Sequence, residues 1–253
     1  KFKLVTDLRN AIVKMLREQW LALTDYDRQA GYFRGLVEFQ KEFQHPLRVF
    51  TLNYDLCVER TCFGNGIDIE RGFNEKRNWD WRQFDESVVE PKPIFLYKLH
   101  GSADWVYQGD ILTYSDDPSR IPEPAIIFGT SYKLQYRDPF LFLAYEFRKW
   151  TLESRIIVAI GYGFGDEHIN RIIQQALSAD KERALLAIFP ANTDKKTDDA
   201  IQEKRQLIAD AIGHANVDQI KFAPCYASEF IREKLQLQYL STFLPPAEQE
   251  PFQ

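Results

Sequence analysis

The chain has 253 residues, 45% of them hydrophobic, which is enough to bury a core in one large α/β domain or two small ones. Its 32 basic and 37 acidic side chains give a net charge of −5, so the global charge predicts no direct nucleic-acid binding. Three cysteines cannot build a disulfide framework, and no apolar run approaches the roughly 20 residues that span a membrane, so we expect a cytoplasmic protein without a membrane partner.

The first 44 residues predict two helices, each expected to bury one apolar stripe. The stripes have three- and four-residue spacing and consist of Phe2, Val5, Leu8, Ile12, Met15 and Leu23, and of Tyr26, Phe33, Val37 and Phe43. His45-Pro46 ends the second helix because the residue before a proline is driven out of the helical conformation. The apolar run from Leu47 to Leu52 then predicts a strand.

The middle of the chain predicts a mixture of short elements. A helix is expected to start near Asp55 and to stop at Gly64-Asn65-Gly66, and residues 71–89 predict an irregular loop pinned by aromatic side chains. Pro93 to Leu99 reads as a strand. Residues 105–114 have a glycine-containing turn between two β-rich runs, which indicates a hairpin. Residues 125–129 are strand-like, and Asp138-Pro139 is typical of a helix start.

From residue 155 onward, strands alternate with helices, which favours an α/β fold with a parallel sheet and right-handed crossovers. The expected elements are a strand to Ile160, a helix through Ala179, a strand from Ala184 to Phe189, a helix from Asp198 to Ala215, a strand from Gln219 to Phe222 and a helix from Ser228 to Leu237. We treat residues 1–243 as a single domain and residues 244–253, rich in proline and glutamate, as a frayed tail.

Three short segments follow three of the predicted strands. They are Thr51-Leu52-Asn53-Tyr54-Asp55, Leu99-His100-Gly101-Ser102 and Gly161-Tyr162-Gly163-Phe164-Gly165-Asp166. Open α/β sheets bind ligands at the carboxyl ends of their strands. The glycine-rich segment also offers backbone donors at the start of a helix, where phosphate binds favourably. The three segments together predict a nucleotide site.

In this order, the segments resemble the sirtuin (silent information regulator) family, whose pattern is Thr-Gln-Asn-Ile-Asp, then His-Gly, then a strand ending in Gly-Thr-Ser. The form found here is closer to the sirtuin-like domains of bacterial anti-phage NAD hydrolases than to the deacetylases. The resemblance spans roughly Leu47 to Leu237. It implies a Rossmann-like parallel sheet flanked by helices, with a small helical or irregular insertion in place of the sirtuin zinc module.

The resemblance implies NAD as substrate, cleaved at the bond between nicotinamide and ribose. Asn53 would orient the nucleophile, Asp55 would engage the nicotinamide, and His100 would act as the base, since an imidazole with a pKa near ~6.5 accepts a proton at cytoplasmic pH. The residues expected to bind the rest of the dinucleotide are Thr51, Gly101, Gly161, Tyr162, Gly163, Gly165, Cys225 and Tyr226, the last two near the adenine.

Each segment also has a purely structural interpretation. Asn53-Tyr54-Asp55 has the composition of a turn and helix cap, and a histidine that closes a strand is usually structural. Asp166 is more typical of a helix N-cap than of a catalytic group. Cys225-Tyr226-Ala227 is equally compatible with a strand-to-helix turn capped by Ser228.

Two departures from the sirtuin pattern matter. The sequence has no Cys-x-x-Cys pair, so we expect neither the zinc module nor another metal, which argues against deacylation. The glycine-rich turn that holds the pyrophosphate in the family is also not found at the start of the chain. We therefore expect Lys1 to lie near the ligand-bearing edge of the sheet, with residues outside this numbering supplying a Gly-x-Gly strand and turn.

The favoured interpretation is an NAD hydrolase that yields nicotinamide and ADP-ribose or a cyclised product. By resemblance it would be the effector of an anti-phage system, acting as a homo-oligomer or beside a partner such as a translocase ATPase or an Argonaute-like protein. Two alternatives stay open. One is an NAD-dependent protein deacylase or ADP-ribosyltransferase, and the other is a non-catalytic module that binds NAD or ADP-ribose.

Overall fold

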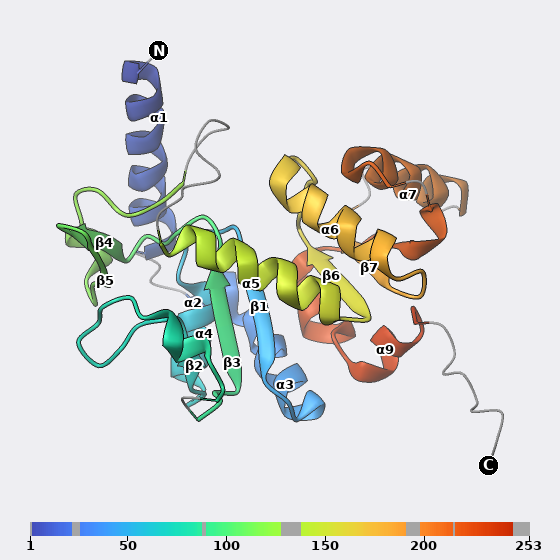
Figure 1. Cartoon of the computed structure of the whole chain (residues 1–253), viewed down its shortest axis with the longest axis horizontal. Helices are drawn as coiled ribbons and strands as arrows, with labels where there is room; N and C mark the ends of the chain where they lie inside the picture. The colour runs from blue at the N-terminus through green and yellow to red at the C-terminus, as the bar shows by residue number, and fades with distance from the viewer. Residues whose placement is uncertain are drawn as a thin grey trace. The chain divides into compact units, whose positions relative to one another are not determined.

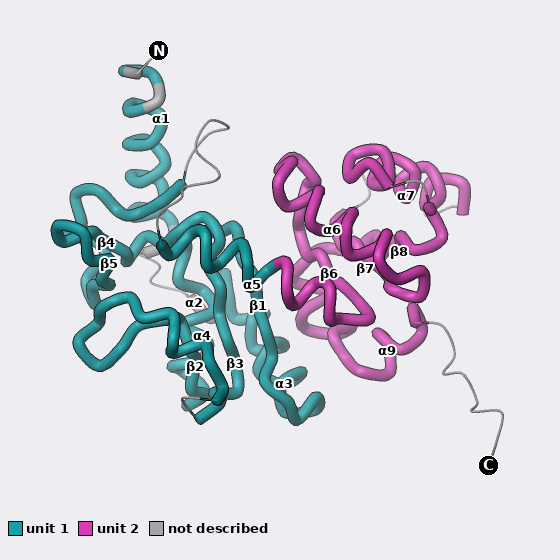
Figure 2. The backbone as a smooth tube through the Cα atoms, viewed as in Figure 1, with its two compact units in different colours: residues 1–147 teal, residues 148–253 magenta. Residues whose placement is uncertain are grey.

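The computed structural model describes residues 2–21, 26–87, 90–127, 138–190, 198–214 and 216–244. The chain divides into two compact units, residues 1–147 and residues 148–253 (Figure 2). Both units have the α/β arrangement that the sequence predicts, because each contains a parallel sheet with helices packed around it (Figure 1). Among the described residues, no helix is both long enough and apolar enough to cross a membrane.

Unit 1 begins with helices. They are α1 (Phe2–Met15), which continues as the π-helix η1 (Leu16–Leu21), then α2 (Tyr26–Ala30), the short 3-10 helix η2 (Gly31–Phe33) and α3 (Arg34–Phe43). Helix α3 buries Leu36, Val37 and Phe39. Of the described side chains of its predicted stripe, only Val37 is buried, while Phe33 and Phe43 are partly exposed.

Two members of the apolar stripe predicted for the first helix are exposed rather than buried. Leu8 and Met15 are 45% and 53% exposed. The segment from α1 to η1 is attached instead through two arginines, since Arg9 donates to the carbonyl of Pro124 at 2.8 Å and Arg17 donates to the carbonyl of Ile121. Periodicity identified the helix correctly, and these two hydrogen bonds hold it in place together with the buried side chain of Val13.

The sheet of unit 1 is parallel and consists of β1 (Leu47–Thr51), β2 (Ile69–Glu70) and β3 (Ile94–Lys98) in the order β1-β3-β2. β3 is central, and its five residues are at most 1% exposed. β1 pairs with β3 in a register that sets Leu47 opposite Ile94 and Thr51 opposite Lys98. The strands expected at 47–52 and 93–99 are therefore present.

The remainder of unit 1 is largely as predicted. Helix α4 (Cys57–Gly64) follows β1, and residues 71–87 form an irregular segment with one 3-10 helix, η3 (Trp81–Phe84). Phe84 stacks on Tyr97 of β3 with ring centroids 4.5 Å apart, so the segment is pinned to the sheet by aromatic packing. β4 (Trp105–Gln108) and β5 (Ile111–Tyr114) form the predicted hairpin, which, with η4 (Pro118–Arg120), is the irregular insertion expected there.

Of the two elements expected after the hairpin, the strand is reduced and the helix is present. Only an isolated bridge between Gly101 and Ile126 forms in the segment expected to be strand-like, and residues 128 and 129 lie outside the described residues. Helix α5 (Phe140–Glu153) begins directly after Asp138-Pro139. The division between the two units falls within this helix.

Unit 2 repeats the alternation of strands and helices. Its strands β6 (Ile156–Ile160), β7 (Ala184–Ile188) and β8 (Ile220–Ala223) are parallel, in the order β6-β7-β8. They alternate with α6 (Glu167–Ala179), α7 (Asp198–Ile212) and the short η5 (Val217–Gln219). β7 is the buried centre, with every residue at most 3% exposed. The single parallel sheet expected from the sequence is thus present as two three-stranded sheets, one in each unit.

The prediction of one continuous last helix from Ser228 to Leu237 is wrong. The chain instead forms α8 (Ala227–Glu229), the π-helix η6 (Phe230–Lys234) and α9 (Leu237–Ser241). The helix breaks at Gln236, whose backbone is extended, and Leu235 and Leu240 on either side of the break are both buried. Lys1 and residues 245–253 lie outside the described residues, so the expected placement of Lys1 and the expected tail stay predictions.

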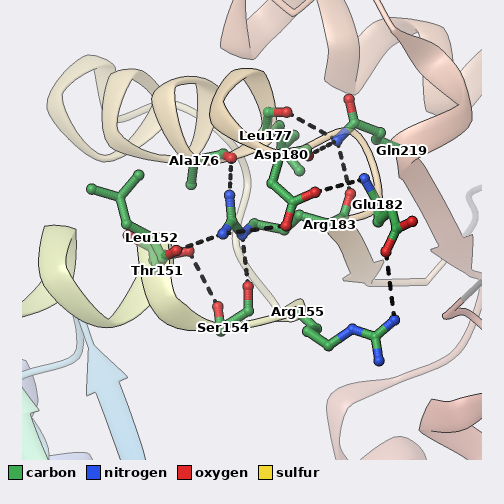
Figure 3. A network of polar contacts seen from close by, with 10 residues as sticks. All are labelled: Thr151, Leu152, Ser154, Arg155, Ala176, Leu177, Asp180, Glu182, Arg183 and Gln219. Atoms are coloured by element: carbon green, nitrogen blue, oxygen red, sulfur yellow. Dashed lines mark hydrogen bonds and ion pairs between the residues drawn. The ribbon is translucent and has the colours of Figure 1, made fainter. Parts of the chain in front are cut away.

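A buried arginine joins the ends of two helices to the sheet of unit 2 (Figure 3). Arg183, 6% exposed, donates to the carbonyls of Leu152, Ser154 and Ala176, which lie at the carboxyl-terminal ends of α5 and α6. These ends carry main-chain carbonyls that have no partner within their own helix. Gln219 extends the network, because its amide nitrogen lies 2.8–3.0 Å from the carbonyl oxygens of Leu177, Asp180 and Arg183.

Replacing Arg183 with methionine removes three donors while keeping most of the side-chain volume. A buried acceptor left without its partner costs about 1–3 kcal/mol, so we expect Arg183→Met to lower the free energy of unfolding by about 3 kcal/mol or more. Urea unfolding followed by circular dichroism measures the change.

Arg155→Met is the matched control, since Arg155 pairs with Glu182 at 3.8 Å while both side chains are more than half exposed. Such pairs contribute about 0–1 kcal/mol, so this variant should unfold almost as the wild type does. Equal losses in the two variants would contradict the role assigned to Arg183.

Candidate functional site

The pairing of β1 with β3 places two predicted catalytic residues at one edge of the sheet. Thr51 lies opposite Lys98, and the amide of Leu99 donates to the carbonyl of Thr51 at 2.9 Å. Asn53 and His100 each follow this pair by two residues. They therefore leave the carboxyl ends of neighbouring parallel strands, which is where α/β sheets bind ligands.

The segment after β1 is a turn that leads into α4. The amide of Asn53 donates to the hydroxyl of Thr51 at 3.0 Å, and the Asn53 side chain is exposed. Asp55 accepts a hydrogen bond from the amide of Cys57 at 2.9 Å, at the start of the helix. Asp55 therefore forms the expected turn, but the N-cap of α4 is Leu56, which makes no side-chain cap bond. Contact of the Asp55 carboxylate with nicotinamide stays a prediction.

His100 occupies a tight turn directly after β3. Its side chain is half-buried, and the amide of Gly101 donates to the carbonyl of Lys98 at 3.0 Å. Gly101 has φ +84°, and a Cβ there would lie 2.0 Å from the carbonyl oxygen of Ala125. Gly101 is among the residues expected to bind the dinucleotide, and that contact stays a prediction. The structure shows that the neighbouring backbone of Ala125 already requires a glycine here.

Residues 125–127 connect the two segments. The amide of Ile127 donates to the carbonyl of His100 at 2.8 Å, and the hydroxyl of Tyr54 donates to the carbonyl of Ile127 at 2.5 Å. The amide of Ala103 also donates to the carbonyl of Tyr54 at 2.9 Å. Burial raises the pKa of Tyr54, which keeps its hydroxyl protonated as the donor. These bonds hold the two strand-end segments against each other.

The glycine-rich segment of unit 2 is an open loop held by one buried aromatic ring. Gly161 has φ +66° and Phe164 has φ +55°, and Phe164 is 8% exposed. Gly163 and Gly165 are exposed, and a Cβ at either position would meet nothing within 4 Å. Packing against the described residues therefore does not require glycine at 163 or 165. Close approach of a ligand to the backbone would require it.

The start of α6 fixes this loop. Asp166 is the N-cap and accepts from the amides of His168 at 3.0 Å and Ile169 at 3.5 Å, which confirms its expected role. Asn170, missed by the sequence analysis, donates to the carbonyl of Phe164 at 2.8 Å and accepts from the hydroxyl of Tyr162 at 2.7 Å. Burial raises the pKa of Tyr162. Its hydroxyl thus stiffens the loop, and contact of Tyr162 with NAD stays a prediction.

The two residues expected near the adenine differ in exposure. Cys225 is 4% exposed, whereas Tyr226 is 66% exposed at the end of β8. Ser228 is not the helix cap that the alternative interpretation expected, because the N-cap of α8 is Tyr226 and makes no side-chain cap bond. Tyr226 therefore presents its ring to solvent, while the protein covers Cys225. Thr51, Asn53, Asp55, His100 and Gly101 belong to unit 1, and the other predicted site residues belong to unit 2.

Four charged residues beside the unit 1 segments were also missed, of which Lys98 and Asp104 are buried while Glu59 and Arg71 are partly buried. Lys98 is 1% exposed and its ammonium lies 3.1 Å from Glu59, while Arg71 lies 3.0 Å from Asp104. A lysine that ends an otherwise apolar strand was the available signal, since a fully buried lysine is rare unless it is paired.

Metal ligation finds no support in the described part of the chain, where no group of three or more histidine, cysteine or acidic side chains could hold a metal ion. The three cysteines are buried and are not joined by a disulfide. Burial raises the pKa of Cys62 to about 12 and also raises that of Cys57. Because thiolates rather than thiols bind metals, these two cysteines are poor ligands.

These features define a Rossmann-like α/β protein with polar and glycine-rich segments at its strand ends. The model of the SIR2-like domain family matches residues 47–211, so the chain belongs to that family. The match contains Asn53, His100 and the glycine-rich loop, and the family resemblance drawn from the sequence is thereby confirmed. SIR2-like domains are generally NAD-dependent enzymes, which gives this chain an NAD-related enzymatic function. No curated protein matches the chain significantly.

Gly101→Ala tests the close approach of the backbone beside His100. The added Cβ would meet a main-chain oxygen, and positive φ adds strain of about 1–3 kcal/mol, so we expect a loss of at least about 2 kcal/mol in the free energy of unfolding. Gly165→Ala, whose Cβ enters open space, should leave stability nearly unchanged. Thermal unfolding compares the two, and wild-type stability of Gly101→Ala would refute the close approach.

The purified protein should contain no stoichiometric zinc and should stay folded in the presence of a chelator, since the raised thiol pKa values oppose metal binding. Elemental analysis by mass spectrometry, with circular dichroism before and after EDTA, checks this. One tightly bound zinc ion per chain would contradict the expectation and would favour the deacylase interpretation.

Proposed function

We propose that this protein is an NAD hydrolase, which cleaves the bond between nicotinamide and ribose to give nicotinamide and ADP-ribose or a cyclised product. The observation that carries the proposal is the position of Asn53 and His100, each two residues beyond the paired residues Thr51 and Lys98, within the part of the chain that matches the SIR2-like domain family.

The chemistry suits these side chains. Nicotinamide becomes neutral as it leaves, so the reaction needs no general acid and depends on positioning and on stabilising an oxocarbenium-like transition state. The amide of Asn53 can orient a water molecule without a charge that would bind the ground-state pyridinium equally well. The imidazole of His100 can take the proton of that water or of a ribose hydroxyl.

Asp55 and the unit 2 loop fit the rest of the substrate. One oxygen of Asp55 accepts from the amide of Cys57, and a carboxylate has about four lone-pair sites, so the carboxylate retains capacity to accept from the nicotinamide carboxamide. The loop from Gly161 to Asp166 precedes the N-terminus of α6. Its exposed glycine backbone and the helix dipole favour the phosphate-ribose half of NAD.

Hydrolysis is favoured over deacylation because the sequence has no Cys-x-x-Cys pair that could build the sirtuin zinc module. In place of that module, the hairpin formed by β4 and β5 follows the His100 segment. The resemblance to anti-phage NAD hydrolases further supports a role as a cytoplasmic defence effector. In that role it would act as a homo-oligomer or with a partner protein such as a translocase ATPase or an Argonaute-like protein.

One assay separates the proposed function from its alternatives. The protein is incubated with NAD, with and without an acetylated peptide, and free nicotinamide is measured by chromatography. Release without peptide supports hydrolysis. Release that depends on the peptide would indicate a deacylase or transferase, and NAD binding without release would indicate a regulatory module.

His100→Ala and Asn53→Ala should each lower the rate of nicotinamide release by about 10²–10⁴ while the protein stays folded, as expected for the loss of a base or a positioning group. His45→Ala is the control, because His45 is exposed and lies before β1, at the opposite end of the strand from Asn53. Wild-type turnover in folded His100→Ala would remove His100 from the mechanism.

A further inference from the structure

The carboxyl end of β3 carries a buried lysine that no step of the proposed chemistry uses. Lys98 is the last residue of β3 and is 1% exposed, although the four residues before it, Ile94–Tyr97, are all apolar or aromatic. Burying an ammonium group is costly unless it is paired and hydrogen-bonded. The position of Lys98, two residues before His100, makes its partners relevant to the site.

The partners of Lys98 belong to the segment that carries the other catalytic candidates. Its ammonium donates to the main-chain carbonyl of Asp55, and it lies 3.1 Å from Oε1 of Glu59. Glu59 is in the first turn of α4, and its side chain is 11% exposed. Lys98 therefore connects the end of β3 both to the turn that contains Asn53 and Asp55 and to the helix that follows it.

The contacts continue to the segment after His100. Arg71 lies 3.7 Å from Glu59 and 3.0 Å from Asp104. Ser102, which is completely buried, donates its hydroxyl hydrogen to Asp104. Burial opposes the charged form of Arg71, but Asp104 and Glu59 outweigh it and raise the pKa of Arg71.

The four residues Lys98, Glu59, Arg71 and Asp104 are called here the ion-pair network, which contains two cations and two anions. The network starts at the carbonyl of Asp55 and ends at the hydroxyl of Ser102. It thus runs from one strand-end segment to the other. Replacing a buried ion pair by apolar residues of similar volume is often neutral or stabilising, so stability alone does not account for charge at this place.

We infer that Lys98 is a positioning residue: through the carbonyl of Asp55 and the carboxylate of Glu59, it holds the Asn53–Asp55 turn in the geometry that the chemistry at His100 needs. The inference rests on the proposed function, because NAD cleavage is the reaction for which the two segments are held. Lys98 itself does not touch the substrate in this scheme, and it acts through the main chain of the turn.

The double variant Lys98→Met/Glu59→Leu removes one cation and one anion together, so the ion pair of Arg71 with Asp104 is left intact. We expect the variant to stay folded, with a kcat for NAD cleavage about 10–100-fold below the wild type, since a misplacement of about 1 Å can cost about 10²-fold. KM should change by less than about threefold, because Lys98 does not bind NAD.

A matched control lies at the other end of the same sheet. Lys92, which precedes β3, and Asp68, which precedes β2, form an exposed ion pair 3.3 Å apart. Lys92→Met/Asp68→Leu makes the same chemical change at the opposite end of the sheet, and its kcat should equal that of the wild type. A similar loss of kcat in both double variants would overturn the inference, because the effect would then not be specific to the ion-pair network.

A second readout tests action through Asn53. If the ion-pair network positions the Asn53 turn, Lys98→Met/Glu59→Leu should lower kcat much less when Asn53→Ala is already present than it does in the wild type. The reason is that the effects of residues that act as a unit are not additive. Long incubations at high enzyme concentration make the low rates measurable. Full additivity with Asn53→Ala, or an unchanged kcat in the folded double variant, would overturn the inference.

Hydrogen–deuterium exchange separates this inference from the proposed function. The double variant should exchange faster than the wild type in peptides that cover residues 52–56 and 100–104, with no change in unit 2. Unchanged exchange in both peptides would overturn the inference even if the wild type cleaves NAD. If the wild type releases no nicotinamide, the proposed function fails by itself, and faster exchange would still support the role of Lys98 in holding the two segments.

Discussion

The parallel pairing of β1 with β3 is the constraint on which the candidate site depends. Because Thr51 is opposite Lys98, the chain leaves both strands at the same height, and the two polar segments emerge side by side. A residue of strand spans about 3.3 Å, so a slip of two residues would separate Asn53 and His100 by a further distance larger than a hydrogen bond. The burial of all five residues of β3 opposes such a slip, since it would expose apolar side chains or bury polar ones.

Both units use a buried cation to satisfy main-chain carbonyls, but the two cations serve different purposes. Arg183 donates to three carbonyls at the ends of α5 and α6, far along the sequence from any predicted site residue, and its role is to hold unit 2 together. Lys98 donates to a single carbonyl, that of Asp55, and shares a carboxylate with Arg71. A planar guanidinium suits three acceptors around one plane, whereas an ammonium suits a compact junction of a carbonyl and a carboxylate.

The sequence predicted the elements whose signal is local. Apolar runs predicted the parallel strands except β2, whose two residues are too short to give a signal, and the turn at Gly109 predicted the hairpin. The first helix was found, but its attachment through Arg9 and Arg17 to carbonyls more than 100 residues away was not, because no periodicity records it. The break at Gln236 was missed for the same reason, since burial of residues on both sides of it depends on the rest of unit 2.

The candidate site shows the same division. The positions of Asn53 and His100 follow from strand ends that are visible in the sequence. The roles of Asn170 and of the ion-pair network that includes Lys98 depend instead on partners that only folding brings together. Glu59 and Lys98, for example, are 39 residues apart. A buried charge at the end of an apolar strand is nevertheless a readable signal, because the physics of desolvation requires that it have a partner.

The glycines of the three segments separate two physical requirements that look identical in the sequence. Gly101 is required by the protein itself, because the carbonyl of Ala125 occupies the place of its Cβ. At Gly163 and Gly165 the space for a Cβ is open, so neither packing nor positive φ explains the absence of a side chain. A glycine there lowers the stability of the folded chain through its larger unfolded-state entropy. Under the proposed function, the exposed backbone before the N-terminus of α6 would meet the phosphate-bearing half of NAD, which favours a helix N-terminus.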